Sequence, residues 1–355
     1  MDSFIISPGS KVYWTQIIPK GGKPMMDRTK HRLRRKVLTA AAGVGAGAAA
    51  LTCGAAHALS GLAMNRKFPA YGKYLNISGG KKDKAFLARR DAAAQALAQM
   101  PSETVTIRSF DGLELVGHLV RCENPRRLII AFHGWRSGWD RDFCLVAPFW
   151  HSHNCDVLYV EQRAQGNSQG DYIGFGLLER KDCLSWARWA DSRNFGLPIY
   201  LSGISMGATT VLMAAGEPLP ESVKGIQADC GFTSPKAIWK HVTEQNLHMS
   251  VGPLRQVCTD LSFRRKLRQG LSAYSTRTAM EQNTIPVLFV HGTEDRFVPI
   301  QMTYDNYLSC AAPRYLVVVP GATHAMSYAV EPETCQKAML SFWQMYDGNT
   351  TKAPS

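Results

Sequence analysis

The sequence predicts an α/β protein with a mostly parallel central sheet and helices on both faces. Short apolar runs of strand length recur at 127–133, 155–160, 198–203, 225–230, 286–292 and 314–320. Stretches with helical spacing lie between or after them, at about 174–192, 206–216, 300–311 and 333–346. Strands that alternate with helices form parallel sheets, and strands covered on both faces are apolar throughout.

A hairpin and a helix precede this series. Residues 104–120 form two alternating runs joined at Asp111-Gly112, a dipeptide typical of hairpin turns. Apolar residues from Ala85 to Met100 repeat at helical spacing, so we expect 65–103 to be a polar linker followed by a helix. The α/β domain is then expected over 104–346, with a short tail at 347–355.

The front of the chain carries a targeting signal. Residues 1–36 hold nine Lys or Arg and two Asp, which accounts for +7 of the formal net charge of +13, and we expect them to form a basic tail. The next 28 residues, 37–64, contain no formally charged side chain and are mostly Ala and Gly. That length is sufficient to cross a bilayer, although the composition is only weakly hydrophobic.

Three interpretations of 37–64 stay open. It is an uncleaved anchor with the α/β domain outside the cell, or an export signal cleaved after Ala56-His57-Ala58. The run from Arg34 to Leu38 also resembles a twin-arginine signal, and a start at Met25 or Met26 would give the basic region a normal signal length. The expected location is therefore the cell membrane, as a transmembrane protein, or outside the cell after loss of a signal peptide.

Composition excludes several classes of function. Outside the basic tail the chain is only mildly basic, and no zinc-finger, RNP or basic-zipper pattern is present, so we expect no nucleic-acid partner. The nine cysteines show neither a C-x-x-C motif nor regular spacing, and several lie in apolar runs. We predict buried free thiols and no metal site.

Two stretches match the G-x-S-x-G pattern of a nucleophilic serine, at 166–170 and 203–207. Ser205 follows the strand 198–203 and directly precedes a helix of small residues, as a strand–turn–helix elbow requires. Ser168 is separated from the preceding strand by polar residues and is not followed by a helical pattern. We therefore predict Ser205 as the nucleophile and Ser168 as a loop residue that helps to shape the site.

A serine nucleophile needs a base, and the base needs an orienting acid. Asp295 and His324 each lie just beyond a later predicted strand, in the order Ser, Asp, His that this architecture uses. Glu294 is the neighbouring alternative, but Asp295 fits the spacing H-G-x-x-D-x-x-V-P. The backbone N–H groups of Trp135, in the loop after 127–133, and Met206, next to the nucleophile, are expected to form the oxyanion hole.

These motifs resemble the α/β-hydrolase superfamily over about 104–345. The matching stretches are H-G-W (133–135), E-x-R-x-x-G-x-S-x-G (161–170), G-x-S-x-G (203–207), H-G-x-x-D-x-x-V-P (291–299) and G-x-x-H (321–324). The stretches 174–190 and 228–234 resemble a bacterial membrane-anchored or exported branch, related to prolyl-oligopeptidase-like and acyl-esterase members. The resemblance implies the α/β-hydrolase fold and a serine hydrolase without a cofactor, and leaves the substrate open.

Residues 231–282 are too long for a simple crossover, so we expect a small cap over the site. Its aromatic and basic residues suit either an apolar acyl pocket with a basic rim or an ordinary solvated surface. The first hypothesis is a carboxylesterase-like hydrolase of small-molecule ester or acyl substrates (EC 3.1.1). A peptidase or amidase with the same triad, a thioesterase or lipase, and a non-catalytic membrane-tethered binding protein are the alternatives.

Overall fold

The computed structural model describes residues 28–67 and 84–348. The expected start positions Met25 and Met26, most of the basic tail, the polar part of the linker and the end of the C-terminal tail lie outside the described residues. The chain divides into two compact units, Met1–Leu51 and Thr52–Ser355. This boundary differs from the one expected after residue 64, because the end of the first helix packs within the second unit.

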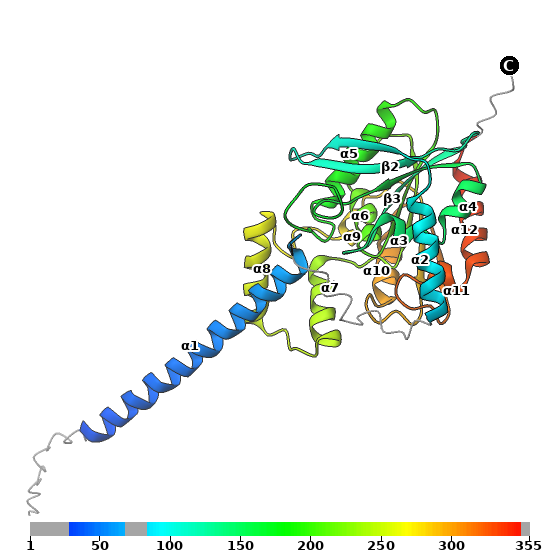
Figure 1. Cartoon of the computed structure of the whole chain (residues 1–355). Coiled ribbons are helices and arrows are strands. Elements are labelled where there is room, and N and C mark those ends of the chain that lie inside the picture. Colours follow the sequence, from blue (N-terminus) through cyan, green and yellow to red (C-terminus); the bar gives the residue numbers. More distant parts are fainter. Residues whose placement is uncertain (1–27, 68–83, 349–355) are drawn as a thin grey trace, which may run out of the picture. The chain divides into compact units, whose positions relative to one another are not determined.

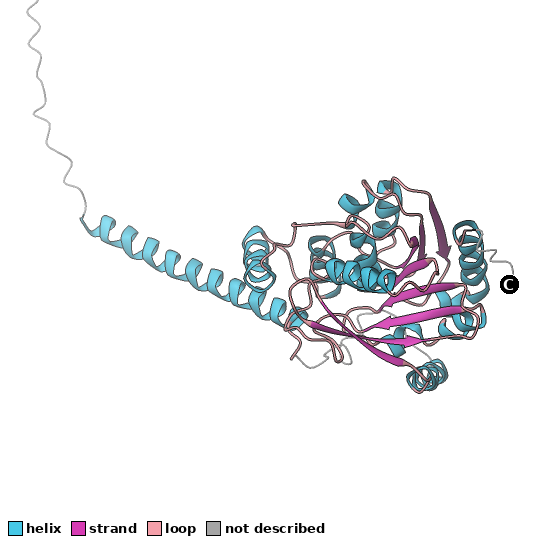
Figure 2. Cartoon of the chain, turned by 90° about the horizontal axis from the view of Figure 1, so that it is seen from above, coloured by secondary structure: helices cyan, strands magenta, loops and turns pink. Residues whose placement is uncertain are grey.

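The second unit is built on an eight-stranded sheet with the order β1-β2-β4-β3-β5-β6-β7-β8. Figure 2 shows the strands in magenta with helices on either side. The strands are β1 (Glu103–Arg108), β2 (Glu114–Val120), β3 (Arg127–Phe132), β4 (Cys155–Val160), β5 (Ile199–Ile204), β6 (Val223–Asp229), β7 (Val287–Gly292) and β8 (Arg314–Val319). The hairpin β1–β2 is antiparallel and β2 pairs antiparallel with β4, whereas every other pair is parallel. The predicted fold class is confirmed.

Alternating side chains of the buried strands pack against helices on opposite faces of the sheet. Leu128, Ile130 and Phe132 of β3 share one core cluster with α5, α6 and α9. Ile129 and Ala131 share the other with α2, α3, α4 and α12. The helices are α2 (Lys84–Ala98), α3 (Trp139–Phe143), α4 (Ala147–Ser152), α5 (Glu179–Ser192), α6 (Met206–Ala214), α9 (Thr276–Met280), α10 (Gln301–Ser309), α11 (Ser327–Val330) and α12 (Pro332–Tyr346).

The segment expected as a cap is helical. It contains α7 (Pro235–His241), the π-helical turn η2 (Val242–Asn246) and α8 (Pro253–Leu267), followed by α9. Figure 1 shows α7 and α8 on the side of the domain where the first helix ends. The buried Phe263 and Leu267 of α8 form a small apolar cluster with Met64 and Leu177.

The first helix, α1 (Arg28–Met64), begins before the uncharged stretch expected at 37–64. Among the described residues, it is the one helix long and apolar enough to cross a membrane. Within the first unit its large apolar side chains, such as Leu33, Val44 and Leu51, are exposed. In the second unit its last turns are built into the domain, with Ala56, Ser60 and Met64 buried.

One part of the cysteine prediction is wrong. Cys53 of α1 and Cys258 of α8 form a disulfide across 205 residues of sequence. Because the two cysteines are so far apart in the sequence, their spacing gives no indication that they pair, and only the folded structure brings them together. The other seven cysteines are free, and all of them except the half-buried Cys122 are buried, as expected.

Candidate active site

Ser205 occupies the sharp turn between β5 and α6. Its φ of 57° and ψ of −116° lie in a strained region for a residue with a side chain. A Cβ atom at Gly207 would overlap the carbonyl oxygen of Phe132, and one at Gly203 would overlap the backbone of Gly207. The two glycines therefore let the turn close against the end of β3, as a nucleophile elbow requires.

Three predicted site residues from separate segments are brought into hydrogen-bonding contact. The Nε2 atom of His324, in the loop after β8, lies 2.9 Å from the Oγ of Ser205. The Nδ1 atom of the same ring lies 2.7 Å from the Oδ2 of Asp295, in the loop after β7. This serine–imidazole–carboxylate chain is the arrangement in which a histidine accepts the serine proton and a carboxylate holds the ring tautomer.

Each oxygen of the Asp295 carboxylate accepts two hydrogen bonds from N–H groups. Oδ2 also accepts a hydrogen bond from the Nε2 of His291 at 3.1 Å, and Oδ1 accepts two from the backbone N–H groups of Phe297 and Val298 at 2.9 Å. Burial alone would raise the pKa of Asp295, but the hydrogen bonds from His291 and His324 hold it well below its usual range. The carboxylate is therefore ionised wherever the protein is folded near neutral pH.

His291 was expected only as part of a motif, and the structure gives it a supporting position. Its Nε2 atom contacts two acceptors, Asp295 and the carbonyl oxygen of Val298, so it carries the proton. Its Nδ1 atom then accepts the hydroxyl hydrogen of Thr303 at 2.7 Å. The side chain is fully buried and holds the same carboxylate oxygen, Oδ2, that His324 contacts.

The loop after β3 runs beside the nucleophile. A Cβ atom at Gly134 would stand 3.4 Å from the Cβ of Ser205. The Gly134 N–H donates to the carboxylate of Asp142 at 2.6 Å, and Ser137 donates to the other oxygen of Asp142 at 2.5 Å. Asp142 thus fixes the turn that carries Trp135, a supporting function that no sequence pattern had indicated.

Buried contacts from the loop after β4 hold the same turn. The buried His133 accepts a hydrogen bond at Nε2 from the Gln162 N–H at 3.2 Å, and its Nδ1 donates to the Gly134 carbonyl at 2.8 Å. Burial lowers the pKa of His133, in keeping with this neutral tautomer. Gln165 accepts the backbone N–H of Arg136 at 2.7 Å.

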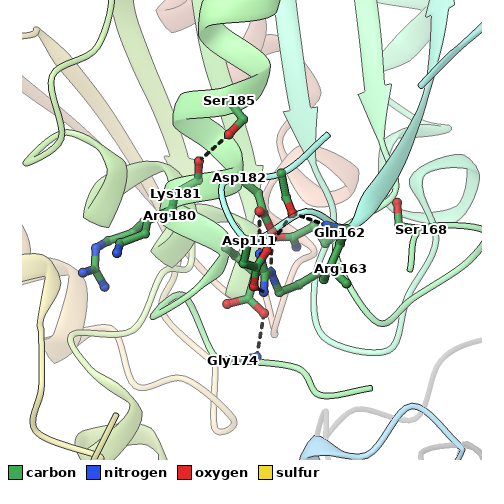
Figure 3. Close-up of polar contacts among 12 residues, drawn as sticks. Asp111, Gln162, Arg163, Ser168, Gly174, Arg180, Lys181, Asp182 and Ser185 are labelled. Carbon is green, nitrogen blue, oxygen red and sulfur yellow. Dashed lines mark hydrogen bonds and ion pairs between the residues drawn. The ribbon is translucent and has the colours of Figure 1, made fainter. Parts of the chain in front are cut away.

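The hydroxyl group of Ser168, the serine of the other G-x-S-x-G stretch, makes hydrogen bonds that hold this loop. Its Oγ accepts the N–H of Val116 at 2.8 Å and donates to the carbonyl oxygen of Glu161 at 2.5 Å. Arg163 of the same loop makes a bidentate contact with Asp182 at 2.5 and 2.6 Å, in a cluster of polar contacts that Figure 3 shows. Arg163 also contacts Asp111 of the hairpin turn at 3.0 Å. Ser168 therefore holds this loop in place, as a loop residue and not as a nucleophile.

The loop beside the nucleophile is hydrogen-bonded to the end of α1. The Trp135 indole N–H donates to the carbonyl oxygen of Ala63 at 2.9 Å, and the Arg136 guanidinium donates to the carbonyls of Leu62 and Asn65 at 2.8 and 2.6 Å. The carbonyls at the end of a helix lack intrahelical partners, and a cation there is favourable. These contacts have no counterpart in the sequence motifs.

An apolar cluster adjoins the nucleophile on the side of the cap. Its buried members include Met206, Phe232, Ile238 and Val298. The partly buried aromatic rings of Trp135, Phe175 and Phe297 pack against them. The Phe297 ring also meets the His324 imidazole edge-on, with centroids 4.9 Å apart. The site therefore offers apolar surface next to its polar reacting groups.

Asp229 and Cys230 lie beneath the triad at the end of β6. The Oδ1 of Asp229 accepts the Ser327 hydroxyl at 2.9 Å, and burial raises the pKa of Asp229 to about 6. The Cys230 sulfur lies within 4.8 Å of ligand atoms of Asp295 and His324. Because those two residues are already bonded to each other, and burial raises the pKa of the Cys230 thiol, we assign no metal ion to this group.

Comparisons with known proteins find relatives with the same fold. Residues 176–350 match the prolyl oligopeptidase family. The uncharacterised protein YqkD of Bacillus subtilis is 25% identical over 259 residues, covering 72% of this chain and 84% of its own. The Pyrococcus furiosus esterase Pf2001 superimposes with a TM-score of 0.55 at 20% identity, covering 72% of this chain and 95% of its own. Est1E of Butyrivibrio proteoclasticus, solved with ferulic acid, gives 0.53 at 19%, covering 68% and 99%.

The chain therefore has the α/β-hydrolase fold, and these similarities support a serine hydrolase. Its C-terminal half resembles the prolyl oligopeptidase family, whereas Pf2001 is an esterase.

Proposed function

We propose that the protein is a carboxylic-ester hydrolase that uses Ser205, His324 and Asp295 as its catalytic triad. The observation that carries the proposal is the continuous hydrogen-bond chain from the strained Ser205 through His324 to the saturated carboxylate of Asp295. Its substrates would be small-molecule esters or other acyl compounds. No cofactor takes part in the proposed reaction.

In the proposed mechanism, the Oγ of Ser205 attacks the acyl carbon while His324 accepts its proton at Nε2. Asp295 keeps the other ring nitrogen protonated and stabilises the imidazolium. The backbone N–H groups of Trp135 and Met206 bind the developing oxyanion, which the approach of the Gly134 turn to Ser205 supports. His324 then protonates the leaving alcohol, and water releases the acid from the acyl-enzyme.

The apolar cluster beside the nucleophile favours an acyl substrate. Ile238 and Phe232 are buried there, and Trp135, Phe175 and Phe297 present partly exposed rings. The esterase neighbours point the same way, whereas the family match at 176–350 favours a peptidase or amidase with the same triad. Peptidase activity is therefore the second candidate, and a binding protein without activity is the remote one.

We further propose that α1 stays attached to the domain as an uncleaved anchor. If cleavage after Ala58 removed the segment, Cys53 would be lost, its disulfide with Cys258 could not form, and the buried Ala56 would be lost as well. Disulfides persist in oxidising compartments, which supports a catalytic domain outside the cell. The cell membrane is accordingly the proposed location.

The test compares p-nitrophenyl esters of increasing acyl length with aminoacyl p-nitroanilides, using the full chain in detergent. A fluorophosphonate probe should label the protein, and Ser205→Ala should abolish both labelling and turnover. Ser168→Ala is the matched control, because it alters the other G-x-S-x-G serine and should still be labelled. Anilide turnover without ester turnover would favour the peptidase, and no labelling of folded protein would refute the triad.

A further inference from the structure

The outer face of α8 exposes a stripe of large apolar side chains. Leu254, Val257 and Leu261 are 43%, 56% and 59% exposed. Their spacing of three and four residues places them on one side of the helix. The opposite side is buried through Phe263 and Leu267, so the stripe is the face of α8 that the domain itself does not cover.

The same face becomes basic toward the end of the helix. Arg264 and Arg265 continue the exposed stripe, and Arg268 follows it one turn later. Residues 253–268 contain five Lys or Arg and a single acidic residue, Asp260, which pairs with Arg264 at 2.6 Å. An apolar stripe next to exposed cations is typical of helices that lie in a bilayer interface.

Two contacts join α8 to the last turns of α1. Cys53 bonds to Cys258, and the Nδ1 of His57 lies 3.2 Å from the Oγ of Ser262. These turns of α1 belong to the second unit, so this end of α1 packs against α8 within that unit.

Chain continuity connects α8 with the candidate membrane span. Cys53 follows Leu51 by two residues, and the candidate span His31–Met64 includes the exposed turns before it. A disulfide at this point holds α8 close to where the chain leaves the bilayer if the turns up to Leu51 are the part that crosses. Val257 directly precedes the bonded Cys258, and Leu254 and Leu261 each lie about one turn of α8 from it.

We propose that α8 is an interfacial helix, whose stripe of Leu254, Val257 and Leu261 rests in the bilayer that α1 crosses. Arg264, Arg265 and Arg268 would meet anionic lipid headgroups, which attract exposed cations close to a membrane surface. The occupant of this face is thus lipid and not a second protein. The inference rests on the proposed anchor but is independent of the proposed ester hydrolysis.

Photo-crosslinking of the full chain in lipid vesicles tests the proposal. Leu261 is replaced by p-benzoylphenylalanine, and the protein is reconstituted in phosphatidylcholine vesicles containing phosphatidylglycerol. Leu308 of α10 is the matched control position, because it is an equally apolar side chain with 71% exposure outside the cap. Illumination should give lipid adducts, seen by mass spectrometry, at Leu261 and at Val257 but only background at Leu308.

The charge requirement is tested in the same system. An Arg265→Gln and Arg268→Gln double variant, or vesicles of phosphatidylcholine alone, should lower the adduct yield several-fold. Adducts at Leu261 no more frequent than at Leu308, in protein that floats with the vesicles, would overturn the proposal, as would crosslinks to a second copy of the chain. Protein that does not float would refute the anchor, whereas loss of ester turnover alone would bear only on the proposed catalysis.

Discussion

The indole nitrogen of Trp135 lies 2.9 Å from the carbonyl oxygen of Ala63, so the loop beside the nucleophile is tied to the end of a helix that begins at Arg28. Arg136 adds two hydrogen bonds to the same helix end, at Leu62 and Asn65. The last turn of α1 therefore supports the loop that carries Trp135. A chain that lacks this turn would lose support for the proposed oxyanion hole.

Trp135→Phe tests this link, because it keeps an aromatic ring and removes the N–H donor. A single hydrogen bond contributes about 1 kcal/mol, so we expect kcat to fall roughly fivefold with little change in KM. Steady-state turnover of a soluble ester measures both constants. Trp189→Phe on α5 is the control and should leave them unchanged, and an unaltered kcat in Trp135→Phe would separate α1 from catalysis.

The tautomer of His324 depends on the carboxylate of Asp295. Asp295→Asn would place an amide where four N–H groups now converge, and we expect kcat/KM to fall about 10⁴-fold. Glu294→Gln alters the exposed neighbouring acid and should retain near-normal activity. Circular dichroism checks that both variants are folded. Equal losses in the two variants would contradict the assignment of Asp295.

The sequence allowed the sheet to be predicted to within two residues at each strand end, because strands buried on both faces form continuous apolar runs. The elbow and the loops that carry Asp295 and His324 follow from that sheet, since parallel strands end at one edge. Two short helices, α3 and α4, were not predicted as elements. With five and six residues they show too few turns for a periodicity to appear.

The remaining features depend on contacts between distant segments. Asp142 and His291 support the site through hydrogen bonds whose partners the sequence does not identify. The disulfide joins two cysteines with no spacing signal, and the burial of Ala56, Ser60 and Met64 follows from docking of the end of α1. These hydrogen bonds, the disulfide and the buried residues of α1 are determined by tertiary packing, which the periodicity of a sequence does not reveal.

Gly207 should tolerate no side chain. A Cβ atom there would overlap backbone atoms of Phe132 and His133, which are held in the sheet and in the oxyanion loop, so neither can give way. We expect Gly207→Ala to lower the free energy of unfolding by about 3 kcal/mol or more and to abolish probe labelling. Gly252→Ala, where nothing lies within 4 Å, is the matched control for thermal unfolding. Similar melting temperatures would contradict the close approach.

Asp229 should make stability depend on pH. Burial raises its pKa to about 6, above the value of about 3.9 in an unfolded chain. Because the pKa of Asp229 is higher in the folded state, protonation of its carboxyl group stabilises the folded state fully at pH values below about 3.9. This stabilisation is lost as the pH rises through about 6. Asp229→Asn removes the titration and keeps an acceptor for Ser327. The variant should therefore gain stability relative to the wild type between pH 4.5 and 8, by up to about 3 kcal/mol in urea unfolding.

The control for this experiment is Glu294→Gln, whose carboxylate is exposed. Its stability relative to the wild type should change little over the same range. A difference between Asp229→Asn and the wild type that is constant with pH, or that shrinks as the pH rises, would show that Asp229 is not buried as a neutral acid at low pH.

The disulfide between Cys53 and Cys258 should stabilise the domain, because it closes a loop of 205 residues. Cross-links of long loops contribute about 2–5 kcal/mol, chiefly by restricting the unfolded chain, so Cys258→Ala should lower Tm by on the order of 5–10 °C. Dithiothreitol should lower the Tm of the wild type to that of the variant and leave the variant unchanged. Cys122→Ala, which alters the half-buried free thiol, is the control and should keep its sensitivity to the reductant. If the reductant shifted none of the three proteins, the two sulfurs would not be bonded, and the tether that holds α8 beside α1 would reduce to the hydrogen bond between His57 and Ser262 and the packing of Met64.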